Sequence, residues 1–359
     1  MTDRLNVCII GSGNWATTIA RNVGNNVANS QSMEPKVNMY VYEEVIQGRR
    51  LTEIINTTHV NVKYMPDFVL PPNIVAFDDV VTTARDADIL IFAIPASFVN
   101  SCCKTLLGKV KPLAHAVSLI KGFERSDDGQ ILLISHLIMR QLKIPCSVLV
   151  GCNLAHEVAL GNFAEGTIGC RDQKYIRILQ DLFKSSSFRV VVTDDADCVE
   201  ICSTLRNIIS FGAGLADGME LNENTKGGII RRGFLETLQF VDVFYPGSRL
   251  ATFFESCGLS DLVTSCYANR NRKLAEAFVK TGQPLSELET LLVPIQEPLG
   301  PVTAELVNIM LKKKGLEEKF PLFTTIYRIC VGSYPLSRLV ETLRYAREDI
   351  YHPNHIFQL

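Results

Sequence analysis

The chain has 359 residues, of which 47% are hydrophobic and 21% charged, with a formal net charge of −2. This length predicts two domains with ample core, and the near-neutral charge gives no electrostatic case for nucleic-acid or membrane partners. The eleven cysteines show no paired C-x-x-C spacing. They favour reduced thiols in a cytoplasmic protein, without a metal site. The first apolar run follows Met1 so soon that we expect no signal peptide.

The first half of the chain alternates strand and helix signals. Short apolar runs predict strands at residues 5–10, 37–42, 87–93, 115–120, 146–151, 166–170 and 188–193, and helical patterns lie at 98–107, 131–142 and 175–183. Strands that alternate with helices imply parallel pairing and right-handed crossovers. We therefore predict an α/β fold whose N-terminal domain, residues 1–194, is a Rossmann-like doubly wound sheet.

After about Asp194 the pattern changes to long amphipathic segments without a convincing strand. These segments lie at residues 196–219, 225–244, 259–267, 272–281, 303–314 and 335–349. We expect residues 195–359 to form a second domain that is all helical.

A glycine-rich turn joins the first strand to the first helix. Its residues, in the pattern G-x-G-x-x-A, are Gly11, Ser12, Gly13, Asn14, Trp15 and Ala16. Gly11 permits the tight turn, Gly13 allows a phosphate to approach the backbone, and Ala16 lets helix and strand pack closely. In this context the pattern predicts a pyrophosphate site at the helix N-terminus, although a purely structural turn remains an alternative.

Two further places in the first half point to the kind of dinucleotide. Glu43 and Glu44 follow the second strand, where a carboxylate can bind ribose hydroxyls and repel a 2′-phosphate, which favours NAD over NADP. Their distance from the glycine turn is longer than usual, so two solvated glutamates are the competing interpretation. Phe98 follows the strand at 87–93 and either flanks the dinucleotide or packs in the core.

Several motifs together resemble the NAD-dependent glycerol-3-phosphate dehydrogenase family of the eukaryotic cytosolic type. They are the glycine turn, Ser118–Gly122, Gly151–Val158, Glu255–Leu262 and Asn269–Lys273, in the order and near the spacing of the family. The resemblance covers about residues 5–345. It implies a homodimer that uses NAD to reduce dihydroxyacetone phosphate, a small phosphorylated triose, to sn-glycerol 3-phosphate, and that catalyses the reverse oxidation.

The resemblance also assigns roles to individual residues. It places Lys121 and Asn153 beside substrate and nicotinamide, and it implies a substrate network of Asn207, Asp261, Ser265, Arg270 and Asn271. The cofactor contacts that it implies are Gly11, Ser12, Gly13, Asn14, Trp15, Ala16, Tyr42, Phe98, Lys121, Ala155, Arg270, Glu297 and Leu299. These roles fit the reaction, since hydride delivery to a ketone requires hydrogen-bond donors or cations at the developing alkoxide, and guanidinium groups bind phosphate well.

Two departures from the family bear on the chemistry. Arg206–Asn207 stands where the family has Lys-Asn as its source of a proton, and Glu297 and Leu299 replace a lysine and a glutamine on a loop that closes over the cofactor. Arginine stays charged up to about pH 12 and cannot act as a neutral base. We expect Arg206 to stabilise the alkoxide electrostatically, while Lys121 or water provides the proton.

Two other interpretations stay open at this stage. The chain could be a catalytically impaired relative that still binds nucleotide or pairs with an active partner, as the change at Arg206 suggests. It could also be another two-domain dehydrogenase, acting on a hydroxyacid or a hydroxyacyl-CoA. For that class the neighbouring His156 and Glu157 are poor candidates, because adjacent residues of one element point apart.

Overall fold

The structure is a computed structural model that describes residues 4–292 and 299–345. Its chain divides into two compact units, Met1–Ala196 and Asp197–Leu359, and each is described by itself.

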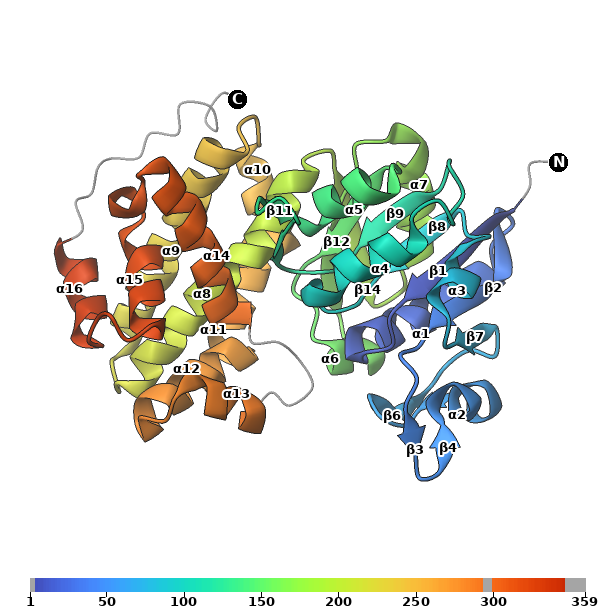
Figure 1. Ribbon diagram of the computed structural model, residues 1–359, viewed down its shortest axis with the longest axis horizontal. Coiled ribbons are helices and arrows are strands. Elements are labelled where there is room, and N and C mark those ends of the chain that lie inside the picture. The colour runs from blue at the N-terminus through green and yellow to red at the C-terminus, as the bar shows by residue number, and fades with distance from the viewer. Residues whose placement is uncertain (1–3, 293–298, 346–359) are drawn as a thin grey trace. The chain divides into compact units, whose positions relative to one another are not determined.

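The first unit is built on one sheet of eight strands (Figure 1). In their order across the sheet, the strands are β14 (Phe188–Thr193), β13 (Ala164–Gly169), β12 (Cys146–Val150), β9 (His115–Ser118), β8 (Ile89–Phe92), β1 (Leu5–Ile10), β2 (Met33–Tyr40) and β7 (Ile74–Phe77). β1 lies next to β2 and β8, so the strand order reverses at the strand that leads into the glycine turn. Open α/β sheets bind their ligands at such a switch point.

Both faces of the sheet are covered, as the apolar strand sequences predict. Along β1, Val7 and Ile9 belong to one buried cluster, while Cys8 and Ile10 belong to another on the opposite face. The helices of this unit are α1 (Asn14–Ala28), α2 (Leu51–Thr58), α3 (Val80–Ala84), α4 (Val99–Leu106), α5 (Ile134–Leu142), α6 (Ala155–Ala159) and α7 (Gln173–Phe183). The predicted Rossmann-like sheet is confirmed.

The prediction of parallel pairing throughout is wrong at one place, since β12 and β13 are antiparallel. The connection between them contains only the five-residue helix α6. A five-residue helix is only about 7.5 Å long, whereas the helix of a parallel crossover runs back along the whole strand, about 16 Å for the five residues of β12, so this link returns the chain in the opposite direction. β14 then pairs in parallel with β13 after the longer helix α7.

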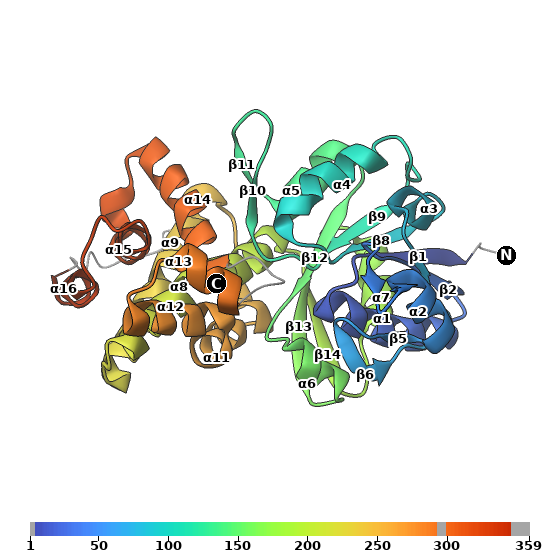
Figure 2. The same ribbon diagram turned by 60° about the horizontal axis from the view of Figure 1, so that its bottom comes forward.

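The sequence analysis missed β7 and three two-stranded hairpins. The hairpins are β3 (Val45–Ile46) with β4 (Arg49–Arg50), β5 (Val60–Asn61) with β6 (Met65–Val69), and β10 (Phe123–Arg125) with β11 (Ile131–Leu133). The helix predicted at 131–142 starts three residues later, because its first residues form β11. Figure 2 shows the β10–β11 hairpin extending away from the sheet.

One histidine lies deep in the first unit. The Nε2 atom of His115 on β9 is 2.8 Å from the Oγ of Ser147 on β12, and its ring stacks on Tyr175. Burial lowers the pKa of His115 to about 4, so the imidazole is neutral near pH 7.

The described part of the second unit, residues 197–292 and 299–345, contains helices and no strand, as predicted. Its helices are α8 (Ala196–Gly218), α9 (Glu223–Phe244), α10 (Leu250–Phe253), the π-helix η2 (Ser256–Ser260), α11 (Asp261–Ala268), α12 (Arg270–Thr281), α13 (Leu285–Leu292), α14 (Leu299–Lys314), the 3₁₀ helix η3 (Glu317–Lys319), α15 (Pro321–Cys330) and α16 (Ser337–Tyr345). α8 begins at the last residue of the first unit and is buried along nearly its whole length.

A buried carboxylate fixes the start of α15. Glu236 on α9 accepts hydrogen bonds from the backbone N–H groups of Leu322 (2.8 Å) and Phe323 (2.9 Å), and it pairs with Arg232 at 3.1 Å. Burial raises the pKa of Glu236 to about 7.

Among the helices of the described ranges, none is long and apolar enough to cross a membrane.

Candidate active site

The glycine turn has the backbone geometry of a pyrophosphate cradle. Gly11 has a φ of +129°, and a Cβ atom added to it would lie 2.4 Å from the carbonyl oxygen of Ala93, so only glycine fits there. Gly13 is extended and caps α1, and an added Cβ would meet nothing within 4 Å. The open side of Gly13 at a helix N-terminus fits a dinucleotide diphosphate.

Two exposed aromatic side chains follow strands that flank β1. Tyr42 comes two residues after β2 and is 69% exposed, and Phe98 follows β8 through a short 3₁₀ turn and is 58% exposed. The core-packing alternative for Phe98 is therefore wrong. Large apolar rings left in solvent at the carboxyl ends of strands are available to stack on planar rings of a ligand.

The glutamates after β2 both have partners within the protein. Glu43 accepts hydrogen bonds from the backbone N–H (3.3 Å) and the hydroxyl of Thr52 at the start of α2, and from Arg50 at 3.0 Å. Burial alone would raise the pKa of Glu43, but the Thr52 and Arg50 contacts lower it overall. Glu44 forms an ion pair with Lys63. Neither glutamate is simply solvated, and ribose binding by them stays a prediction.

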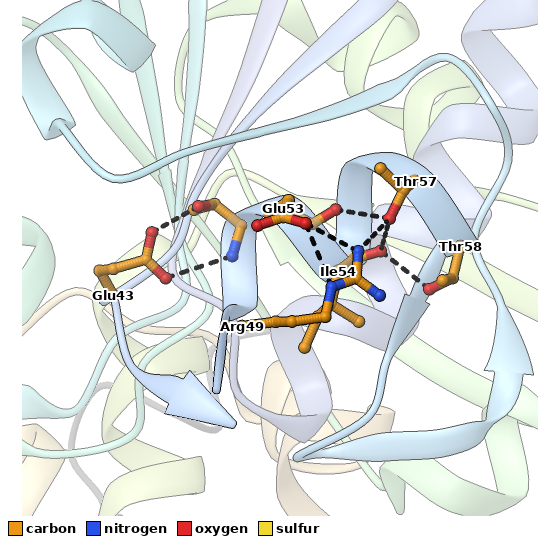
Figure 3. A network of polar contacts seen from close by, with 7 residues as sticks. Glu43, Arg49, Glu53, Ile54, Thr57 and Thr58 are labelled. Atoms are coloured by element: carbon orange, nitrogen blue, oxygen red, sulfur yellow. Dashed lines mark hydrogen bonds and ion pairs between the residues drawn. The ribbon is translucent and has the colours of Figure 1, made fainter. Parts of the chain in front are cut away.

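Figure 3 shows two sets of polar contacts at α2, one between Glu43 and the start of the helix and one that joins Arg49, Glu53, Ile54, Thr57 and Thr58. Arg49 donates to Glu53 (2.9 Å) and to the hydroxyl of Thr57 (3.1 Å), while the Thr57 and Thr58 hydroxyls also donate to backbone oxygens of the same helix. The arginines that follow β2 are therefore neutralised by carboxylates, which disfavours a 2′-phosphate here.

Lys121 and Asn153 follow two adjacent strands, β9 and β12. The Nζ of Lys121 donates to the carbonyl oxygen of Gly151 at 2.9 Å. In the amide orientation that satisfies its neighbours, the Asn153 nitrogen donates to the carbonyls of Glu165 (2.8 Å) and Cys152 (2.9 Å). Ala155 starts α6, and its carbonyl accepts from Thr18 of α1 at 3.1 Å. This contact ties α6 to the helix that follows the glycine turn.

In the second unit, Arg206 and Asp261 form a buried ion pair. The Nε of Arg206 on α8 lies 2.7 Å from Oδ2 of Asp261 on α11, and the side chains are 9% and 5% exposed. The hydroxyl of Ser203, a residue that the sequence analysis missed, donates to the same oxygen at 2.9 Å. Nη1 of Arg206 is buried without a hydrogen-bond partner among the described residues. Such a donor suits a ligand oxygen, because leaving it unpaired has an energetic cost.

A chain of amides orients the neighbouring Asn207. The backbone N–H of Gly300 donates to Oδ1 of Asn271 (3.1 Å), whose Nδ2 donates to Oδ1 of Asn207 (3.0 Å). This polarity turns the Asn207 side chain so that its NH₂ group is the free end, and Nδ2 is a buried donor with no partner within the described ranges. Leu299 opens α14 and is half-buried. Glu297 lies outside the described residues.

Arg270 and Ser265 complete the predicted set. Arg270 is the first residue of α12, and the side chain of Asn269 caps this helix through the backbone N–H of Asn271 at 2.9 Å. Partial burial and the positive charge of Arg206 lower the pKa of Arg270. Ser265 is buried on α11, one helical turn after Asp261. The structure therefore brings together Arg206, Asn207, Asp261, Arg270 and Asn271.

This arrangement is that of a donor-rich site for an anion. The positive charges of Arg206 and Arg270 lie close enough to interact, and the carboxylate of Asp261 offsets part of this charge. The N-terminus of α12 adds a partial positive charge. No group of three His, Cys, Asp or Glu side chains that could hold a metal ion occurs in residues 4–292 and 299–345. A Rossmann-like unit with a pyrophosphate cradle and a helical unit with an anion site define the nucleotide-dependent dehydrogenase class.

Comparisons with known proteins specify the family. The family model described as NAD-dependent glycerol-3-phosphate dehydrogenase N-terminus matches residues 6–176, and its C-terminus counterpart matches residues 195–341. The chain belongs to the NAD-dependent glycerol-3-phosphate dehydrogenase family.

Relatives and solved structures agree over nearly the whole chain. The cytoplasmic NAD⁺-dependent glycerol-3-phosphate dehydrogenase of Drosophila melanogaster is 56% identical over 356 residues, which cover 99% of this chain and 96% of that protein. The protein of the same name from Bos taurus is 46% identical, covering 98% and 99%. The glycerol-3-phosphate dehydrogenase structure from Plasmodium falciparum matches with a TM-score of 0.90 at 38% identity, covering 94% and 95% of the two chains.

Proposed function

We propose that the protein catalyses the NAD-dependent reduction of dihydroxyacetone phosphate to sn-glycerol 3-phosphate and the reverse oxidation. The observation that carries this proposal is the donor set of the second unit, in a chain that belongs to this family. Arg206 and Asn207 each have a buried donor atom that no described residue satisfies, beside Asp261, Arg270 and Asn271. A phosphate ester with neighbouring oxygens supplies the acceptors that such donors require.

The first unit provides most of the cofactor residues in this proposal. The N–H groups of the turn at Gly11–Gly13 and the start of α1 bind the diphosphate, and Tyr42 and Phe98 offer apolar faces to the planar rings. The family resemblance adds Lys121 and Ala155 of this unit, and Arg270, Glu297 and Leu299 of the second unit. When bound, the reduced nicotinamide supplies the hydride that the ketone carbon accepts.

Reduction also requires a proton for the developing alkoxide. Arg206 stabilises this negative charge electrostatically but keeps its own proton. We assign the proton to Lys121, with water as the alternative source. Lys121, Asn153, Asn207, Asp261, Ser265, Arg270 and Asn271 are the proposed substrate residues.

The direct test measures NADH oxidation with dihydroxyacetone phosphate and compares it with NADH oxidation with a 2-ketoacid and with a 3-ketoacyl-CoA. We expect turnover of the triose phosphate alone. Purified, folded protein that consumes no NADH even at high enzyme concentration would contradict the proposal. That outcome would instead favour the impaired relative that pairs with an active partner, an alternative for which the comparisons give no support.

We further propose a homodimer that resides in the cytoplasm. The dimer is implied by the family resemblance, and relatives at 46–56% identity are named cytoplasmic. Light scattering after size-exclusion chromatography measures the mass directly. A monomer at micromolar concentration would contradict the dimer.

A further inference from the structure

The peptide bond between Ser12 and Gly13 is held in place by two buried side chains. The carbonyl oxygen of Ser12 accepts a hydrogen bond from the hydroxyl of Thr17 at 3.1 Å and another from Nδ2 of Asn61 at 2.8 Å. Nδ2 of Asn61 also donates to the Thr17 hydroxyl at 3.0 Å. The three residues form a closed triangle beneath the glycine turn, with exposed fractions of 7%, 2% and 0% for Ser12, Thr17 and Asn61.

Asn61 reaches the turn from a different part of the chain. It ends β5, the first strand of a short hairpin with β6, and lies 49 residues after Ser12. Its Oδ1 accepts from the backbone N–H of Tyr64 at 3.4 Å, which fixes the orientation of the amide. Both Nδ2 hydrogens are then used, one on Ser12 and one on Thr17. A fully buried amide with every group satisfied is rigid and specific.

The direction of the Ser12 carbonyl decides the direction of the next N–H. In a trans peptide the C=O and N–H groups point to opposite sides, and this bond is trans. Fixing the Ser12 oxygen towards Asn61 and Thr17 therefore aims the Gly13 N–H away from them. Gly13 caps α1 and has open space on its Cα, so its N–H stands where an anion can approach the helix N-terminus.

We propose that Asn61, together with Thr17, is a positioning residue that presets the Gly13 N–H for the pyrophosphate of the dinucleotide. The role rests on the proposed NAD-dependent activity. Presetting the peptide removes the cost of ordering it on binding, so it raises affinity without adding a contact to the ligand. The motif analysis identified the turn but not Asn61, because nothing in a short polar hairpin marks a residue that supports a turn so far away in sequence.

The test replaces Asn61 with aspartate, which has the same shape but no N–H donors. An ionised carboxylate would face the Ser12 carbonyl, repel it and free the peptide to rotate. The hydrogen bond that would be lost is the one from the Gly13 N–H to the charged diphosphate. A hydrogen bond to a charged group is worth about a tenfold to hundredfold change in affinity. We expect Asn61→Asp to raise the Kd of ADP-ribose and the KM of NADH at least about tenfold. The KM of dihydroxyacetone phosphate at saturating NADH should stay within about twofold, because the change acts on the diphosphate alone.

The binding measurement has a built-in reporter. Trp15 is the only tryptophan of the chain and lies in the glycine-turn motif, so its fluorescence follows NADH binding directly. ADP-ribose binding is measured by calorimetry on the full chain. The matched control is Asn73→Asp, which removes an amide that donates to the backbone carbonyls of Gly24 (2.9 Å) and Pro35 (2.6 Å) away from the turn. This control should lower Tm but leave the Kd of ADP-ribose unchanged.

A second pair of variants decides the question if Asn61→Asp does not fold. Thr17→Val keeps the shape but loses the hydroxyl, and Thr17→Ser keeps the hydroxyl; we expect weakened ADP-ribose binding in the first and recovery in the second. Equal affinities in wild type, Asn61→Asp and Thr17→Val, or in the two Thr17 variants when only these fold, would overturn the positioning role and leave the proposed function intact. A wild-type protein that binds neither NADH nor ADP-ribose would overturn both.

Discussion

Replacing Arg206 with lysine restores the residue type that the family uses to deliver a proton. The side chain at this position is 9% exposed and pairs with Asp261 at 2.7 Å. A lysine keeps the positive charge and can still pair with Asp261, but unlike arginine it can give up its proton in a buried site. We therefore expect Arg206→Lys to raise kcat for dihydroxyacetone phosphate reduction.

The size of the increase follows from the worth of acid–base catalysis. A positioned proton donor contributes about 10²–10⁴-fold, or about 3–5 kcal/mol of activation free energy. Lys121 or water already supplies part of this in the proposed mechanism, so we expect a gain of at least about tenfold. Folding stability should change little because the ion pair persists, whereas Arg206→Met would remove the cation from a buried ion pair and cost about 3–5 kcal/mol.

The assay is NADH oxidation at saturating substrate between pH 6 and 10. The control is Arg232→Lys, another conservative exchange in an ion pair with a buried carboxylate, that of Glu236. Only the Arg206→Lys variant should show both a higher kcat and a new limb in its pH profile, since arginine does not titrate in this range. An unchanged kcat and pH profile in the folded Arg206→Lys variant would refute the reasoning.

Three more predictions follow from single residues. Gly11→Ala should abolish NADH binding measured by Trp15 fluorescence, since its Cβ would lie 2.4 Å from the Ala93 oxygen; Gly227→Ala, with open space around it, should bind normally. Asn207→Asp should raise the KM of dihydroxyacetone phosphate at least about tenfold with ADP-ribose affinity unchanged, because a carboxylate replaces the free NH₂ donor and repels phosphate. For His115 the pKa in the folded protein, about 4, lies below the ordinary histidine value of 6.5, so its contribution to stability is complete above pH 6.5 and is lost as pH falls towards 4. Urea unfolding should show that wild type loses about 3 kcal/mol more than His115→Gln over this interval; equal losses would contradict the shift.

The sequence predicts best what depends on local patterns. Strands such as Ile89–Phe92 are apolar on both faces, and the glycine turn combines a strand, a positive φ and a helix start within a few residues. The predicted sheet and helical second unit are accordingly confirmed. The hairpins, whose strands have two to five residues, and the reversal between β12 and β13 were not predicted, because a short apolar run does not reveal the direction of its partner.

For the candidate site too, the sequence predicts the residue types but not the tertiary contacts between them. The residue types at Arg206, Asp261 and Asn271 indicate anion chemistry, yet nothing in their spacing says that Arg206 pairs with Asp261, 55 residues away. The polarity of the Asn207 amide depends on the backbone N–H of Gly300, which no sequence pattern expresses. Asn61 is the extreme case, since its role comes entirely from a tertiary hydrogen bond to Ser12.

The presence of Arg206 in place of the family's lysine should affect proton transfer but not the attraction of the site for the substrate. Arg206 and Arg270 bring two positive charges, Asp261 offsets one, and a bound phosphate ester brings up to about two negative charges. A lysine at position 206 gives the same sum near neutral pH, so the attraction for the substrate does not depend on which cation is present. Only the capacity to exchange a proton differs. Arg206→Lys should therefore move kcat while the KM of dihydroxyacetone phosphate stays nearly constant, and a change confined to KM would mean that Arg206 acts mainly by holding the phosphate.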